Sequence, residues 1–124
     1  MHRSRLAGFI IDCQTGDLDG AAVFWSAALG LETEGVDGPT YVRLDGTSRD
    51  MVIEVQQVEH PSRVHLDIES DDVEAEVARL ERLGARQIEQ IKTWVVMEAP
   101  TGQRFCVVRA KVDLGDRAGA RAWK

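Results

Sequence analysis

Two residues in strand-like stretches of this sequence carry side chains that could move a proton or bind a polar ligand: Glu54 and His65. Glu54 interrupts an apolar run, and a buried carboxylate is costly without a partner, so it pairs, binds a ligand or faces water. The imidazole of His65 changes its charge near neutral pH. We predict that both side chains line a cavity, with Glu54 bonded to His65 or Arg43. The alternative for His65 is a purely structural, hydrogen-bonded role.

Alternation of apolar and polar residues assigns these side chains to one face of their strands. In residues 63–68 every second residue is apolar, which is typical of a strand with one buried face. Similar alternation in 40–44, 51–57, 94–99 and 103–110 leaves further side chains on the face opposite the core. Together they predict a trough for a small polar or aromatic ligand. The predicted lining residues are Tyr41, Arg43, Glu54, His65, Asp67, Trp94, Glu98 and Cys106.

The elements that must position these residues occur twice. Residues 8–56 and 63–108 each read as a strand, a helix and three short strands, and Asp12 and Asp67 mark equivalent positions. Halves of this size cannot each bury a sufficient core, so we expect them to pack together around a ligand cleft. The prediction is an α+β fold of two βαβββ modules related by pseudo-twofold symmetry. A curved mixed sheet would enclose the cavity, with the helices on its outer face.

Helical periodicity predicts helices over 17–29 and 72–83. Before the second helix, Asp71 and Glu74 fit a capping box, and Gly84 is placed to end it. The predicted core includes Leu18, Ala21, Trp25 and Leu29 of the first helix, Val73, Val77 and Leu80 of the second, and Val64, Leu66 and Ile68 of the strand at 63–68.

Composition narrows the class of protein. The chain has 124 residues, enough for one domain, and its net charge of −6 argues against a nucleic-acid partner. No apolar run approaches the roughly 18 residues that a membrane helix needs, and no signal peptide is recognisable. Cys13 and Cys106 do not make a disulfide framework, so we predict free thiols in a reducing cytoplasm. His2 and His60 fall in stretches that we expect to be flexible.

A series of short motifs in both halves carries a likeness to a known family. The first half contains Asp17, Ala21, Phe24-Trp25 and Leu29-Gly30-Leu31, and the second contains His65-Leu66-Asp67-Ile68, Asp72-Val73, Leu83-Gly84-Ala85 and the run from Pro100 to Val107. Their order and spacing resemble the vicinal oxygen chelate superfamily, which includes glyoxalase I, extradiol dioxygenases and bleomycin- and fosfomycin-resistance proteins. The chain is most similar to compact glyoxalase-like domain proteins common in actinobacteria. The resemblance implies one such domain over 1–112, with modules at about 6–58 and 62–111. The segment 113–124 is charged and rich in Gly and Ala, so we expect a surface tail that is frayed or packed on a partner.

The resemblance also implies where a metal would bind. Enzymes of the superfamily hold a divalent metal with one residue from the first strand and one from the last strand of each module. Those positions fall on Ile10, Glu54, His65 and Cys106. Isoleucine cannot ligate, and Cys106 stands where a glutamate is expected, so we expect no cofactor. The alternative is Zn, Ni, Mn or Fe held by Glu54, His65 and Cys106. Asp12 and Asp67, two residues further along their strands, look too distant to substitute. We expect them to bind polar ligand atoms or to pair with Arg63, Arg43 or the backbone.

Three functions remain open at this point. The first is a small-molecule-binding protein of the glyoxalase or bleomycin-resistance type, without a complete metal site, that recognises or sequesters a metabolite or antibiotic. The second is a metal-dependent lyase or isomerase in which Glu54 is the catalytic residue that moves a proton. The third is a structural or regulatory dimer with a vestigial cavity. In each case we expect a homodimer, with Phe24, Trp25 and Trp123 as candidate interface residues, and no membrane partner.

Overall fold

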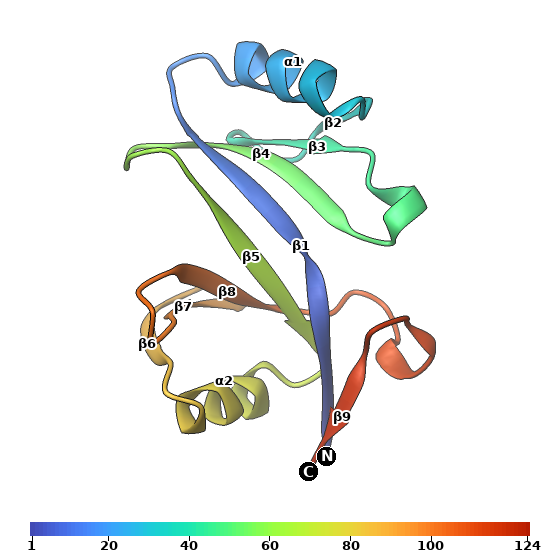
Figure 1. The fold of residues 1–124 in the computed structure, drawn as a ribbon, viewed down its shortest axis with the longest axis vertical. Helices are drawn as coiled ribbons and strands as arrows, with labels where there is room; N and C mark the ends of the chain where they lie inside the picture. The colour runs from blue at the N-terminus through green and yellow to red at the C-terminus, as the bar shows by residue number, and fades with distance from the viewer. The chain divides into compact units, whose positions relative to one another are not determined.

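The computed structural model describes residues 1–124 apart from the side chain of Ser48. A strand, a helix and three strands follow one another twice along the chain (Figure 1). The predicted α+β fold of two βαβββ modules is therefore confirmed. The first module comprises β1 (His2–Gln14), α1 (Leu18–Leu29), β2 (Thr33–Val36), β3 (Tyr41–Leu44) and β4 (Val52–Val58); the second comprises β5 (Arg63–Ser70), α2 (Val73–Arg82), β6 (Arg86–Ile91), β7 (Trp94–Glu98) and β8 (Arg104–Arg109). Short 3-10 helices η1 (Thr47–Arg49) and η2 (Leu114–Asp116) and strand β9 (Arg121–Trp123) are the remaining elements.

Strand pairing repeats between the modules. The sheet has the order β2-β3-β4-β1-β5-β8-β7-β6, with β9 paired to β1. In each module the first strand runs parallel to the last, β1 with β4 and β5 with β8. The other neighbours within each module are antiparallel. Both copies therefore place their first and last strands side by side, and these strands carry four of the eight predicted site residues, Glu54, His65, Asp67 and Cys106.

The chain divides into two compact units whose boundaries differ from those of the predicted modules. One unit is Gly8–His65, and the other combines Met1–Ala7 with Leu66–Lys124. The division falls within β1 and within β5. The first residues of the chain therefore pack with the second half of the sequence, which local periodicity could not indicate.

The unit Gly8–His65 has an apolar core between its strands and α1. Leu44, Ile53 and Val55 are buried, which confirms the alternation predicted for residues 51–57. Leu29 is 43% exposed and was wrongly assigned to the core. The helix stops there because Gly30 adopts a left-handed conformation, with φ of 68°, and turns the chain away. Partly buried residues packed against this core are Phe9, Cys13, Leu18, Ala21, Trp25, Leu31 and Met51.

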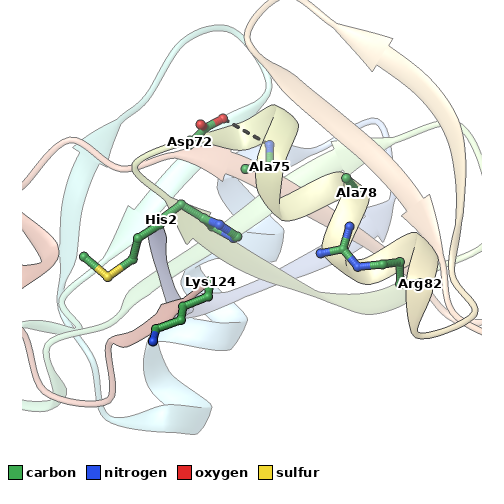
Figure 2. A pocket seen from close by; sticks show the side chains of 7 residues that line it. His2, Asp72, Ala75, Ala78, Arg82 and Lys124 are labelled. Atoms are coloured by element: carbon green, nitrogen blue, oxygen red, sulfur yellow. Dashed lines mark hydrogen bonds between the residues drawn. The ribbon is translucent and has the colours of Figure 1, made fainter.

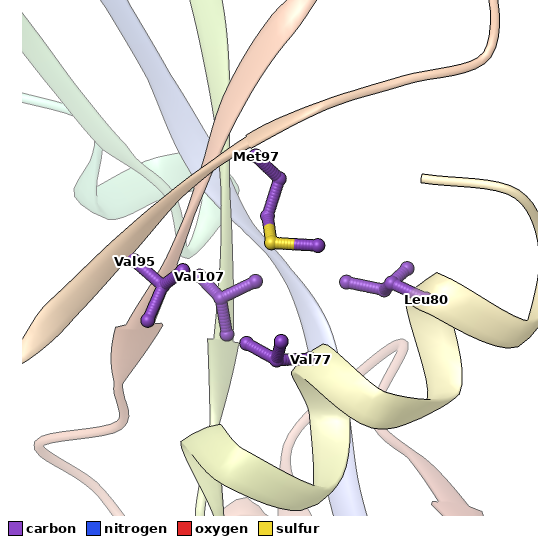
Figure 3. Packing of buried hydrophobic residues seen from close by; sticks show 5 residues of the cluster. All are labelled: Val77, Leu80, Val95, Met97 and Val107. Atoms are coloured by element: carbon purple, nitrogen blue, oxygen red, sulfur yellow. The ribbon is translucent and has the colours of Figure 1, made fainter. Parts of the chain in front are cut away.

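The other unit packs α2 against β7 and β8. Figure 3 shows the side chains of this core, Val77, Leu80, Val95, Met97 and Val107, turned toward one another. They confirm the stripe predicted for the second helix and the inward faces predicted for the last two strands.

The residue that caps α2 differs from the prediction. The cap is Asp72, whose side chain accepts a hydrogen bond from the backbone N–H of Ala75. Asp71 instead accepts from the backbone N–H of Arg3 at 2.8 Å. The predicted capping box was therefore one residue out of register, because the sequence could not show that Asp71 bonds to a distant strand.

The predicted burial of Val64 and Leu66 and the predicted tail both need correction. Val64 and Leu66 are 59% and 51% exposed, because the apolar cluster of their strand begins only at Ile68. The segment 113–124 packs on its own chain rather than fraying. Its β9 pairs antiparallel with the start of β1, and Figure 1 shows the two chain ends side by side there. Leu114 in this segment is fully buried.

In the described part of the chain, neither helix has the length and apolar character to cross a membrane.

Candidate functional site

In the unit Gly8–His65, polar residues gather on the sheet face turned away from the core. Glu54 on β4 is in register with Ile10 on β1 and with Arg43 on β3. Because Ile53 and Val55 point into the core, Glu54 between them points to the opposite face. Glu54 and Ile10 are nevertheless both buried. A buried carboxylate on this face needs compensation, and its neighbours provide it.

Arg43 compensates the charge of Glu54. Nε of Arg43 lies 3.9 Å from Oε2 of Glu54, and Nη2 lies 3.7 Å from Oδ2 of Asp37. Both distances are those of ion pairs and exceed hydrogen-bond range. The predicted contact between Glu54 and Arg43 is thus present, in a form loose enough for the arginine to reach a ligand. Tyr41 lies two residues before Arg43 on β3, in register with Gln56, and is half-buried.

Asp12 is the most buried polar residue of this face, with 2% of its surface exposed. Its Oδ2 lies 2.8 Å from Nδ1 of His65, 3.7 Å from Nε of Arg63 and 3.9 Å from Nε2 of His60. Its other oxygen, Oδ1, is buried and has no hydrogen-bond donor among the described residues. The predicted pairing of Asp12 with Arg63 is present as an ion pair, and the structure adds the candidate imidazole as a closer partner. The position of Asp12, 55 residues before Asp67 in the repeat, was the available signal.

In the second module, Asp67 on β5 is in register with Cys106 on β8. His65 lies two residues before Asp67 on the same strand, and such residues share a face. Ligand atoms of His65, Asp67 and Cys106 all lie within 4.8 Å of one another. The predicted metal-binding set was Glu54, His65 and Cys106, whereas this group has Asp67 in place of Glu54. Asp67 belongs to it because the parallel register of β5 and β8 places Cys106 beside Asp67.

Glu98 and Trp94 lie on β7 of the same unit, and Glu98 is bound by two arginines. Its carboxylate accepts hydrogen bonds from Nε of Arg86 at 2.9 Å and Nε of Arg104 at 3.3 Å. The hydrogen bond from Arg86 is the main reason that the pKa of Glu98 lies below its usual value. A carboxylate held in this way is a weak candidate for binding a ligand. Trp94 is half-buried on the same strand face.

Another buried carboxylate, that of Glu76 on α2, was missed by the sequence analysis. It accepts a hydrogen bond from Nε2 of His2 at 2.8 Å and two from Arg79, each also 2.8 Å. Burial would raise the pKa of Glu76, but hydrogen bonds from Arg79, His2 and Ser4, together with the charge of Arg79, lower it to about 2. Arg79 also stacks on the ring of Trp123. The cluster ties α2 to both chain ends, so His2 is buried in β1 rather than flexible as predicted.

A surface pocket of about 310 Å³ opens beside this cluster (Figure 2). It contains none of the eight predicted lining residues. The dashed line in Figure 2 is the cap of α2, and the pocket extends along α2 from this cap to Arg82, beside the two chain ends. Its lining consists of Met1, His2, Asp72, Ala75, Ala78, Arg82 and Lys124.

A family model described as a glyoxalase-like domain matches residues 8–108. The match covers both modules and stops before η2 and β9. Among curated proteins, no significant match is found.

Solved structures share the fold at low sequence identity. A hypothetical protein from Bacillus halodurans C-125 has a TM-score of 0.68 at 12% identity, over 89% of this chain and 96% of that one. Methylmalonyl-CoA epimerase from Mycobacterium tuberculosis has a TM-score of 0.63 at 14% identity, over 91% of this chain and 92% of that one. A Mn(II)-bound glyoxalase from Novosphingobium aromaticivorans has a TM-score of 0.59 at 21% identity, over 91% of this chain and 44% of that chain. At these identities the likeness establishes the fold alone.

Proposed function

The chain belongs to the glyoxalase-like domain family, and we propose from this premise that it binds a small polar or aromatic molecule. Membership confirms the predicted resemblance to glyoxalase-like domain proteins. The observation that carries the proposal is Oδ1 of Asp12, a buried carboxylate oxygen without a hydrogen-bond donor in the described structure. Buried polar atoms are almost always satisfied, so an exception calls for an explanation. A ligand that brings a hydrogen-bond donor would supply one.

Besides Asp12, the proposed binding residues in Gly8–His65 are Tyr41, Arg43, Glu54 and His65. Arg43 holds its carboxylate partners only at ion-pair distance and can turn its guanidinium toward an anionic group of the ligand. Tyr41 offers a ring for an aromatic ligand. Asp67, Trp94 and Glu98 of the second module remain predicted contacts, with Glu98 the least suited because its arginines occupy it.

A thermal-shift screen of polar and aromatic metabolites and of glycopeptide antibiotics tests the proposal. We expect at least one compound to raise the melting temperature, and we expect Arg43→Ala to abolish that shift. Arg109→Ala is the matched control, because Arg109 is an exposed arginine at the end of β8. A screen without any stabilising compound, or equal shifts in Arg43→Ala and the parent protein, would count against this site.

A metal-dependent lyase or isomerase is the second candidate, and the group of His65, Asp67 and Cys106 favours it. Nitrogen, oxygen and thiolate sulfur form a ligand set that zinc accepts, and three protein ligands leave one position open for substrate. When bound, the metal would act as a Lewis acid on a substrate oxygen. Glu54 is then the residue proposed to move the proton.

Metal analysis of protein purified without chelator separates the two candidates. Binding by this group predicts stoichiometric metal that is lost in Cys106→Ser and kept in Cys13→Ser. Cys13 is a suitable control because it is the other free cysteine and packs against the apolar core. If the purified protein contains no metal and takes up no added zinc, the metal-dependent function is ruled out and small-molecule binding is the remaining candidate.

We also propose a cytoplasmic homodimer. The two free thiols support a reducing compartment. Exposed apolar side chains support self-association: Val64 and Leu66 lie on one face of β5, and Phe24 on α1 is exposed as well. Trp123, predicted as an interface residue, instead donates a hydrogen bond from Nε1 to Ser4 in its own chain. Sedimentation of the protein and of Leu66→Asp tests the dimer, which the aspartate should dissociate.

A further inference from the structure

The contact between Asp12 and His65 determines which ring nitrogen carries a proton. Nδ1 of His65 lies 2.8 Å from Oδ2 of Asp12. A carboxylate only accepts hydrogen bonds, so the proton between them belongs to Nδ1. We propose that Asp12 is a positioning residue, which fixes Nδ1 of His65 as the donor, so that the neutral form of the ring carries its lone pair on Nε2.

The surroundings of Asp12 suit this role. Arg63 and His60 approach the same oxygen, Oδ2, at 3.7 and 3.9 Å. The charge of Arg63 therefore offsets part of the negative charge of the oxygen that faces His65. Asp12 lies on β1 in parallel register with Gln56 of β4, so its backbone is held by the sheet. Burial of the carboxylate removes competing water from the contact with His65. The imidazole is therefore oriented by a fixed acceptor before any ligand arrives.

This tautomer specifies the chemical class of group that His65 can meet. A lone pair on Nε2 binds a group that offers a proton, such as a hydroxyl or an amide N–H, or a divalent metal ion. In this neutral form the ring offers no donor at Nε2 to an acceptor such as a ligand carboxylate. This inference rests on the proposed function in assuming that His65 contacts the ligand, and it adds that the ligand atom there is a donor or a metal.

The tautomer itself can be read from nitrogen NMR of the ligand-free protein. Spectra of 15N-labelled protein at a pH where the ring is neutral should show proton-bearing Nδ1 and unprotonated Nε2 for His65. The signals of His65 are identified by their loss in His65→Gln, which separates them from His2 and His60. In Asp12→Ala we expect the Nε2–H form or an average of the two tautomers. An Nε2–H ring in the unaltered protein would overturn the proposal, even if Asp12→Ala fails to fold.

Zinc affinity, measured by competition with a chelating dye, tests the consequence for binding. Loss of a carboxylate that orients a ligating imidazole costs about 10–100-fold in metal affinity, which is the drop expected for Asp12→Ala. Asp19→Ala is the matched control, because Asp19 is an exposed aspartate on α1; it should leave the affinity unchanged. If His65→Gln weakens zinc binding and Asp12→Ala does not, Asp12 has no positioning role. If His65→Gln has no effect either, the proposed metal function fails, and the NMR result still decides the tautomer.

Discussion

Among the described residues, two buried carboxylates each bond to a histidine at 2.8 Å, and they differ in how many of their oxygens are hydrogen-bonded. Glu76 accepts from His2 and twice from Arg79, so both of its oxygens are bonded. Asp12 accepts from His65 through one oxygen, while its other oxygen has no donor among the described residues. The carboxylate of Glu76 therefore has no oxygen left to accept a hydrogen bond from a ligand. The carboxylate of Asp12 has one.

This difference indicates which cluster holds the fold together and which serves a site. The Glu76 cluster joins α2 to His2 near one end of the chain, and its Arg79 contacts Trp123 near the other. The Asp12 cluster lies on the polar face of a sheet whose other face already packs against an apolar core. A buried, half-satisfied carboxylate lowers stability and persists where function requires it. The predictions below test this division of roles.

The largest effect is expected from Glu76→Ala. The substitution leaves His2 and Arg79 without their shared acceptor, and removal of one partner from a buried ion pair costs about 3–5 kcal/mol. Urea denaturation measures the change in the free energy of unfolding. Glu74→Ala, an exposed glutamate on the same helix, is the control and should change stability by no more than about 0.5 kcal/mol. Equal effects of the two would mean that Glu76 is not structural.

Acid should weaken the Glu76 cluster selectively. The pKa of Glu76 is about 2 in the folded protein and 4.5 in its ordinary state, so the folded state favours the charged form. The stabilisation is therefore fully present above about pH 4.5 and is lost as the pH falls toward 2. Its size is about 3 kcal/mol. Denaturation of the parent protein and Glu76→Gln at pH 6 and pH 2.5 should show a gap that closes in acid. A gap that stays constant contradicts the assignment.

Much of the fold follows from the sequence, because it depends on local patterns. The repeat predicted two βαβββ modules, and alternation correctly assigned Ile53 and Val55 to one core and Val95 and Met97 to the other. The errors occur where a distant segment decides the outcome. Asp71 bonds to the backbone of Arg3, and the last strand returns to pair with β1. No periodicity within a window of one element can report such contacts.

The site was less predictable, for two physical reasons. Glu76 occupies the stripe of α2 between Val73 and Val77, which is a signal of burial, but its partner His2 is 74 residues away. The expected metal set took Glu54 because the family pattern places a ligand at the end of each module. The register of β5 with β8, which places Cys106 beside Asp67, cannot be predicted from the residue types of the two strands.

A smaller effect is expected from Asp12→Ala. The substitution breaks the hydrogen bond to His65, worth about 1.5–3 kcal/mol when one partner is charged, but it also removes a buried oxygen that has no donor. We expect a net loss of about 1–2 kcal/mol, clearly below that of Glu76→Ala. The same urea titration measures it. A loss as large as that of Glu76→Ala would make Asp12 a structural residue and remove the contrast between the clusters.

The smallest effect is expected from Arg63→Ala. The side chain of Arg63 is 45% exposed and its Nε is 3.7 Å from Asp12, so solvent and distance weaken the attraction. We expect a change of no more than about 0.5 kcal/mol in the free energy of unfolding. A cost of several kcal/mol would instead show that Arg63 completes the bonding of Asp12 in solution, as Arg79 does for Glu76. Asp12 would then have no unmet hydrogen-bonding capacity to offer a ligand.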